Sequence, residues 1–166
     1  MKRQDARPAR SEFLEPEASL DRLASAVLGA AVEVHKSLGP GLLESVYEHA
    51  VCVELSLRGV TFRRQVSVAF EYKGHPVGEG RLDLLVDERL IVELKAVESL
   101  EPIHRVQVHT YLKATGLWLG LLVNFNVPLL LRGVQRVVLT SNARKSEAAS
   151  EQTFSDPGGP GVLALK

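Results

Sequence analysis

Residues 81–97 contain two apolar runs around a short charged segment, and this stretch constrains the fold more than any other part of the chain. The runs flank Asp87-Glu88-Arg89, and such an arrangement predicts a β-hairpin. Three charged residues interrupt the runs: Asp83 in the first, and Glu93 and Lys95 in the second. Because side chains alternate between the two faces of a strand, Glu93 and Lys95 are expected to point to the same face.

The register of the hairpin decides whether Asp83 joins the other two charged residues. A three-residue loop pairs Val86 with Leu90, and Asp83 then lies across from Glu93. A two-residue loop shifts the pairing by one residue and sends Asp83 to the opposite face. We expect the three-residue loop, which groups two carboxylates and one ammonium.

Two carboxylates a few ångströms apart repel each other, and a divalent cation between them removes the repulsion. Oxygen ligands suit Mg²⁺, with Mn²⁺ as the alternative, better than they suit zinc. A neighbouring ammonium can orient an attacking water or offset charge on a phosphate. The structural alternative is an edge hairpin with a hydrated polar face, where Glu93 and Lys95 form a weak surface pair. That alternative is the more common case for an isolated pattern, so the rest of the chain has to decide.

Composition narrows the class of protein. The 166 residues suit one domain with a sizeable core, and 20 basic residues balance 20 acidic ones. A net charge of zero gives no global basic field for tight non-specific binding of nucleic acid. The single Cys52 excludes an intrachain disulfide, and no apolar run is long enough to span a membrane. We therefore expect a cytoplasmic protein without a membrane segment.

Two helices are predicted before the hairpin. The first begins after Ser19, a candidate N-cap, and ends at Gly39-Pro40-Gly41. Its expected buried stripe comprises Leu20, Leu23, Val27, Ala31, Val34 and Leu38. The second runs from about Leu42 to Arg58, and its expected buried stripe comprises Val46, Ala50, Val53 and Leu57.

Glu44 lies in the first turn of the second predicted helix, with Tyr47 three residues later on the neighbouring surface. A glutamate at this position commonly compensates the helix dipole. The functional alternative has Glu44 reaching over the sheet as a further acidic group at the metal. Both interpretations remain open from the residues alone.

Further strands and a third helix complete the predicted order. Val66 to Tyr72 alternate as a strand with one apolar face, and Gly78 and Gly80 mark a bulge or a close backbone approach. The third helix runs from Leu100 or Pro102 to Ala114, with Ser99 as a candidate cap. Its residues His104, Gln107 and Tyr111 share one stripe.

The last predicted strands follow this helix. Residues 118–125 are apolar enough for a central strand, while 129–131 and 134–139 suggest edge strands. The order predicts one α/β domain over residues 19–140, with a mixed central β-sheet flanked by helices. Residues 1–18 and 141–166 are expected to be disordered tails.

Three motifs occur in a fixed order along the chain. Gly41 to Tyr47 reads Gly-x-x-Glu-x-x-Tyr, Asp83 is followed by Glu93-Leu94-Lys95, and Gln107 to Tyr111 reads Gln-x-x-x-Tyr. In this combination the chain resembles the GxxExxY family, a bacterial group of the PD-(D/E)XK nuclease superfamily. The resemblance covers about residues 20–139 and implies an αβββαβ restriction-endonuclease-like core with an extra N-terminal helix. One departure is Leu82, which replaces the proline of the superfamily name and matters little because that proline is not a ligand.

The resemblance also implies roles for the residues of the acidic group. Asp83 and Glu93 would bind Mg²⁺, with the carbonyl group of Leu94 as a further ligand. Glu44 would complete the acidic cluster directly or through water. Lys95 would orient the attacking water or steady the phosphate.

The other motif residues are expected on the substrate side. Gln107 and Tyr111 would hold the site or the substrate phosphate, and Tyr47 is counted with them as a substrate-binding residue. His104, one turn before Gln107, would contact a phosphate; this extension goes beyond the motif.

Three hypotheses follow. The first is a Mg²⁺-dependent nuclease that acts on DNA, with RNA as the less favoured substrate. The alternative is a non-catalytic nucleic-acid-binding or assembly module that keeps the nuclease fold. The third is an ordinary α/β scaffold, which predicts Asp83 and Glu93 on opposite faces. Because the net charge is zero, affinity for nucleic acid would be modest or supplied by a protein partner or a second copy of the chain.

Overall fold

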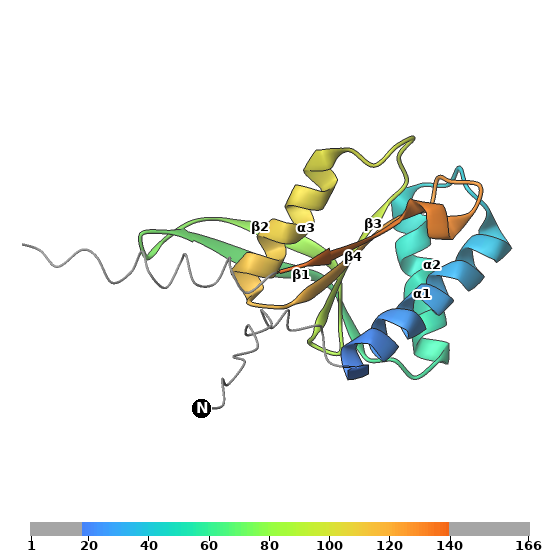
Figure 1. Cartoon of the computed structure of the whole chain (residues 1–166), viewed down its shortest axis with the longest axis horizontal. Coiled ribbons are helices and arrows are strands. Elements are labelled where there is room, and N and C mark those ends of the chain that lie inside the picture. The colour runs from blue at the N-terminus through green and yellow to red at the C-terminus, as the bar shows by residue number, and fades with distance from the viewer. Residues whose placement is uncertain (1–17, 140–166) are drawn as a thin grey trace, which may run out of the picture. The chain divides into compact units, whose positions relative to one another are not determined.

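The computed structural model describes residues 18–139, which form three α-helices, five strands and one 3₁₀ turn (Figure 1). The elements in order are α1 (Ala18–Leu38), α2 (Glu44–Leu57), β1 (Phe62–Tyr72), β2 (His75–Val86), β3 (Leu90–Lys95), α3 (Pro102–Thr115), β4 (Leu119–Asn124), η1 (Leu130–Gly133) and β5 (Val134–Val138). The predicted order of helices and strands is confirmed. The predicted tails, apart from Ala18 at the start of α1, lie outside the described residues.

The five strands form one mixed sheet in the order β1-β2-β3-β4-β5. Strands β3 and β4 are parallel, and the other neighbours are antiparallel. All six residues of β4 are buried, as expected for a strand with neighbours on both sides. The prediction of an α/β domain with a mixed central sheet and flanking helices is confirmed, and the arrangement is that of a restriction-endonuclease-like fold.

The helices cover both faces of the sheet, with α1 and α2 on one side and α3 on the other (Figure 1). The main core joins α1 and α2 to alternate residues of β2, β3 and β4, among them Leu84, Val92 and Leu121. On the other face α3 approaches β4 closely, because a Cβ added to Gly120 would lie 2.4 Å from Cγ1 of Val108. A glycine at this position therefore lets the helix pack directly on the strand.

The predicted buried stripe of α2 is wrong. Val46, Val53 and Leu57 are 40%, 60% and 77% exposed. The residues that face the core are instead Tyr47, Glu48, Val51, Cys52 and Leu55. Apolar periodicity identified the wrong face because two of the buried side chains, Tyr47 and Glu48, are polar.

Three smaller expectations also differ from the structure. Ser19 lies inside α1, which begins at Ala18. Glu101, not Ser99, is the N-cap of α3, and it forms a capping box with His104. Residues 130–133 form a 3₁₀ turn in place of the edge strand expected at 129–131.

Within residues 18–139, no helix combines the length and apolar character that crossing a bilayer requires.

Candidate active site

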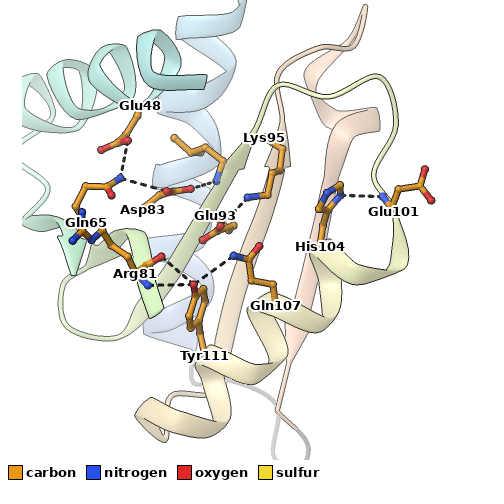
Figure 2. Close-up of polar contacts among 11 residues, drawn as sticks. Glu48, Gln65, Arg81, Asp83, Glu93, Lys95, Glu101, His104, Gln107 and Tyr111 are labelled. Atoms are coloured by element: carbon orange, nitrogen blue, oxygen red, sulfur yellow. Dashed lines mark hydrogen bonds and ion pairs between the residues drawn. The ribbon is translucent and has the colours of Figure 1, made fainter. Parts of the chain in front are cut away.

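The β2–β3 hairpin has the three-residue loop that the sequence predicted. Val86 pairs with Leu90, and Leu84 pairs with Val92. By this register Asp83 lies opposite Glu93, but the paired region ends at Leu84 and Val92. Beyond this point the Asp83 side chain links β2 to β3, since its Oδ2 accepts a hydrogen bond of 2.8 Å from the Leu94 backbone N–H (Figure 2). The hypothesis that Asp83 and Glu93 lie on opposite faces is therefore wrong.

Glu93 and Lys95 form a buried ion pair beside Asp83 (Figure 2). Nζ of Lys95 lies 2.9 Å from Oε1 of Glu93, and the two side chains are 13% and 3% exposed. The second carboxylate oxygen of Glu93, Oε2, is buried and has no hydrogen-bond partner among residues 18–139. An unpaired buried carboxylate oxygen is costly, so a further positive or hydrogen-bonding group at this oxygen would stabilise the site.

The electrostatics of the site show an excess of negative charge. Burial, together with the charge of Asp83, raises the pKa of Glu93 to about 7. Burial also raises the pKa of Asp83, although the Leu94 N–H and the Lys95 charge oppose the rise. Burial alone would lower the pKa of Lys95, but the Glu93 carboxylate reverses this and raises it. Both carboxyls and the amine hold protons more tightly than usual, which indicates that one lysine does not balance the acidic groups.

Two glutamates of α2 add to this negative field. Glu44 is partly buried, and its charge acts on Asp83, Glu93 and Lys95. Glu48, one turn later, is buried and also acts on Asp83. Its Oε1 accepts a hydrogen bond from Nε of Arg64 at 3.0 Å, and its Oε2 accepts one from the amide of Gln65 at 2.9 Å.

Glu48 and Gln65 were missed from the sequence. The one available signal for Glu48 is its spacing of four residues from Glu44, which places both acids on one side of the helix. Gln65 carried no signal, because a polar residue at the start of a strand is ordinary.

Gln107 and Tyr111 of α3 hold the backbone of β2 near the acidic group. The Tyr111 hydroxyl donates to the carbonyl oxygen of Arg81 at 3.1 Å and accepts from the Arg81 N–H at 3.3 Å. The Gln107 amide donates to the same hydroxyl at 3.4 Å (Figure 2). A Cβ on Gly80 would lie 2.6 Å from the Tyr111 ring, so the predicted close backbone approach is found here. These contacts connect α3 to the strand that carries Asp83 two residues later.

Tyr47 occupies a position that a substrate does not reach. Its side chain is fully buried and stacks on Phe125, with ring centroids 4.4 Å apart. Its hydroxyl donates to the Gly39 carbonyl at 2.6 Å and accepts from the Leu42 N–H at 3.1 Å. The expectation that Tyr47 contacts substrate is corrected accordingly: it fixes the turn that leads into α2 and Glu44.

His104 also has a structural partner. Its Nδ1 accepts the backbone N–H of Glu101 at 3.0 Å and completes the capping box of α3 (Figure 2). The cap therefore sets the orientation of the His104 ring, and a phosphate contact of this residue stays a prediction.

The donor set partly fits the hard divalent cation that the sequence predicted. Asp83 and Glu93 provide oxygen donors, one of them unpaired, and the local field is negative. Within residues 18–139, however, no three carboxylate, imidazole or thiol side chains are arranged as a metal site. The charge of Glu44 acts on Asp83, Glu93 and Lys95, and its role as a ligand, directly or through water, stays a prediction.

Comparisons with known proteins identify the superfamily of the chain. A family model for the PD-(D/E)XK nuclease superfamily matches residues 21–137. This range includes all motif residues named above, and it includes all five strands apart from the last residue of β5. Among curated proteins, none matches the chain. Among solved structures, the chain is similar to the one titled "Crystal structure of SSO0001", with 17% sequence identity and a TM-score of 0.47. The similarity covers 80% of this chain and 61% of the other, so this chain spans about three fifths of that protein. The chain belongs to the PD-(D/E)XK nuclease superfamily, whose members generally use divalent metals.

Proposed function

We propose that the chain is a Mg²⁺-dependent nuclease of the GxxExxY family that hydrolyses phosphodiester bonds of DNA, with RNA as the less favoured substrate. One observation carries the proposal: Asp83, Glu93 and Lys95 meet where β2 and β3 stop pairing, and an oxygen of Glu93 is buried there without a partner among the described residues. Membership of the nuclease superfamily supports the same reaction class.

Each residue of the site has a role that its position allows. Asp83 and Glu93 would hold the cation, and Glu44 on α2 would complete the acidic group directly or through water. A bound divalent cation supplies Lewis acidity and lowers the pKa of a bound water. Lys95, fixed by Glu93, presents an ammonium that orients the attacking water or offsets charge on the phosphate. Gln107 and Tyr111 keep the Arg81 backbone in place and so support the strand that carries Asp83.

A cleavage assay tests the proposal. Purified protein is incubated with single-stranded, duplex and branched DNA and with RNA, in Mg²⁺, Mn²⁺ or EDTA. We expect cleavage that needs the metal and falls at least about 100-fold in Asp83→Asn, Glu93→Gln and Lys95→Met. Glu88→Gln is the matched control, because Glu88 is an exposed carboxylate in the turn of the same hairpin, paired with Arg63. Substrates that all stay intact with both metals would contradict the proposal.

A second candidate is a non-catalytic nucleic-acid-binding or assembly module that keeps the fold. The observation that favours it is that residues 18–139 contain no preformed three-ligand metal site. It predicts binding of nucleic acid that Asp83→Asn and Glu93→Gln leave unchanged, without any cleavage. A gel-shift titration of these variants beside the wild type separates the two candidates.

A further inference from the structure

Gln65 is the only residue of β1 with a left-handed backbone, at φ 51°. This conformation is sparsely populated for residues other than glycine, and where it persists in a strand the surrounding structure has to favour it. The pairing of β1 with β2 is interrupted at the same place, since Arg64 pairs with Leu84 and Val66 with Leu82. By this register Gln65 lies opposite Asp83.

The left-handed backbone of Gln65 accompanies an unusual placement of its side chain. The amide Nε2 lies 2.9 Å from Oε2 of Glu48 and 3.4 Å from Oδ1 of Asp83 (Figure 2). One NH₂ group has two hydrogens, so it can donate to both carboxylates at once. A neutral donor between two acids reduces their repulsion without adding a charge that would compete for a cation.

The two oxygens of Asp83 are thus held from opposite sides. Oδ1 accepts from Gln65 on β1, and Oδ2 accepts from the Leu94 N–H on β3. Gln65 is in turn anchored on Glu48, which Arg64 holds through its other oxygen. These hydrogen bonds connect α2 and three strands through side chains at the place where backbone pairing stops.

We propose that Gln65 is a positioning residue that, with Glu48 as its anchor, orients the Asp83 carboxylate for cation binding. The inference rests on the proposed cation site. Gln65 orients Asp83 and takes no part as a ligand, so its loss weakens the site without removing it.

The test uses Gln65→Met in the full chain. Methionine has nearly the same length and the same unbranched Cβ, so the backbone strain is unchanged while both donors are removed. The first readout needs no metal: hydrogen exchange of the Leu94 amide, compared with that of Val92, which is paired with Leu84 in the same strand. We expect Leu94 to exchange about fivefold faster in the variant and Val92 to keep its rate, because a freed Asp83 no longer holds the Leu94 N–H.

The second readout is calorimetric titration with Mn²⁺ and Mg²⁺ alone. Affinity is expected to fall about three- to tenfold in Gln65→Met. Gln65→Asn serves as a second variant, since asparagine tolerates the left-handed backbone but is too short to span both carboxylates, and it should behave like the methionine variant. Ser67→Ala is the matched control, because Ser67 lies on the same strand and bonds Glu79, away from the acidic group.

The two readouts distinguish the positioning role of Gln65 from the proposed metal-dependent function. If the relative exchange of Leu94 is the same in wild type, Gln65→Met and Gln65→Asn, the positioning role is overturned whatever the metal affinity. If the wild type takes up no cation, the proposed function is overturned, and the role of Gln65 in cation binding falls with it. Faster Leu94 exchange together with weaker cation binding supports the inference.

Discussion

Helices α1 and α2 pack on the same face of the sheet, but they bury different kinds of side chain. The buried residues of α1 are aliphatic except for His35, whose Nε2 lies 2.8 Å from the Val127 carbonyl oxygen. Helix α2 buries Tyr47 and Glu48, while Val53 and Leu57 remain exposed. The orientation of α2 is therefore not the one that would bury the most apolar surface.

The two helices bury different side chains because α1 packs mainly against the core, whereas α2 also carries residues of the acidic group. Helix α1 contributes mainly to the core, so its buried face follows its apolar stripe. Helix α2 presents Glu44 and Glu48 toward the strands that carry the acidic group, and Tyr47 fixes the turn before it. A helix that supports a polar site departs from simple amphipathic patterning, as local rules are often broken at functional sites.

The largest expected effect tests which face of α2 is the core face. Leu55 is completely buried, and Leu55→Ala should lower the free energy of unfolding by about 2–5 kcal/mol because it leaves a cavity. Urea denaturation followed by circular dichroism measures the change. Val27→Ala on α1 is the comparison, as Val27 is equally buried but its side chain is smaller, and it should cost less. A loss below about 0.5 kcal/mol for Leu55→Ala would show that this face is not the core.

The next effect tests whether the acidic group costs stability. The pKa of Glu93 is raised to about 7 in the fold from an ordinary 4.5, so the metal-free protein loses stability as pH rises through this range. Glu93→Gln removes that loss while keeping an oxygen for Lys95. The variant should therefore exceed the wild type by on the order of 1–3 kcal/mol at pH 8, and the difference should vanish below about pH 4.5.

Thermal unfolding at several pH values in EDTA measures this difference. Saturating Mg²⁺ should then stabilise the wild type more than the variant, because only the wild type has both carboxylates to bind it. A variant less stable than the wild type at pH 8 would mean that the Glu93–Lys95 ion pair outweighs the cost of burying the charge.

The smallest effect concerns the exposed apolar face of α2. Leu57 is 77% exposed, so Leu57→Ala should change the free energy of unfolding by less than about 0.5 kcal/mol. The measurement is the same urea titration, with Leu55→Ala as its reference. A cost close to that of Leu55→Ala would show that the sequence pattern of α2 had identified a face that is covered in solution.

The sequence by itself determined the order of helices and strands, the loop of the hairpin and the grouping of Asp83, Glu93 and Lys95. These features depend on local rules: the periods of helices and strands, the glycines that end them, and the alternation of side chains across a hairpin. The end of α3 at Gly116, with φ 69°, illustrates such a local signal.

Only the tertiary structure decided which face of α2 is buried, that Tyr47 supports a turn, and that Glu48 and Gln65 extend the acidic group. Each of these depends on contacts between residues far apart in sequence, such as Gln65 with Asp83 and Tyr111 with Arg81. A polar residue gives no pattern that reveals its partner, because its hydrogen bonds are set by how the elements pack. The grouping of Asp83, Glu93 and Lys95 could thus be predicted from the sequence, but the contacts that Glu48 and Gln65 make with the acidic group could not.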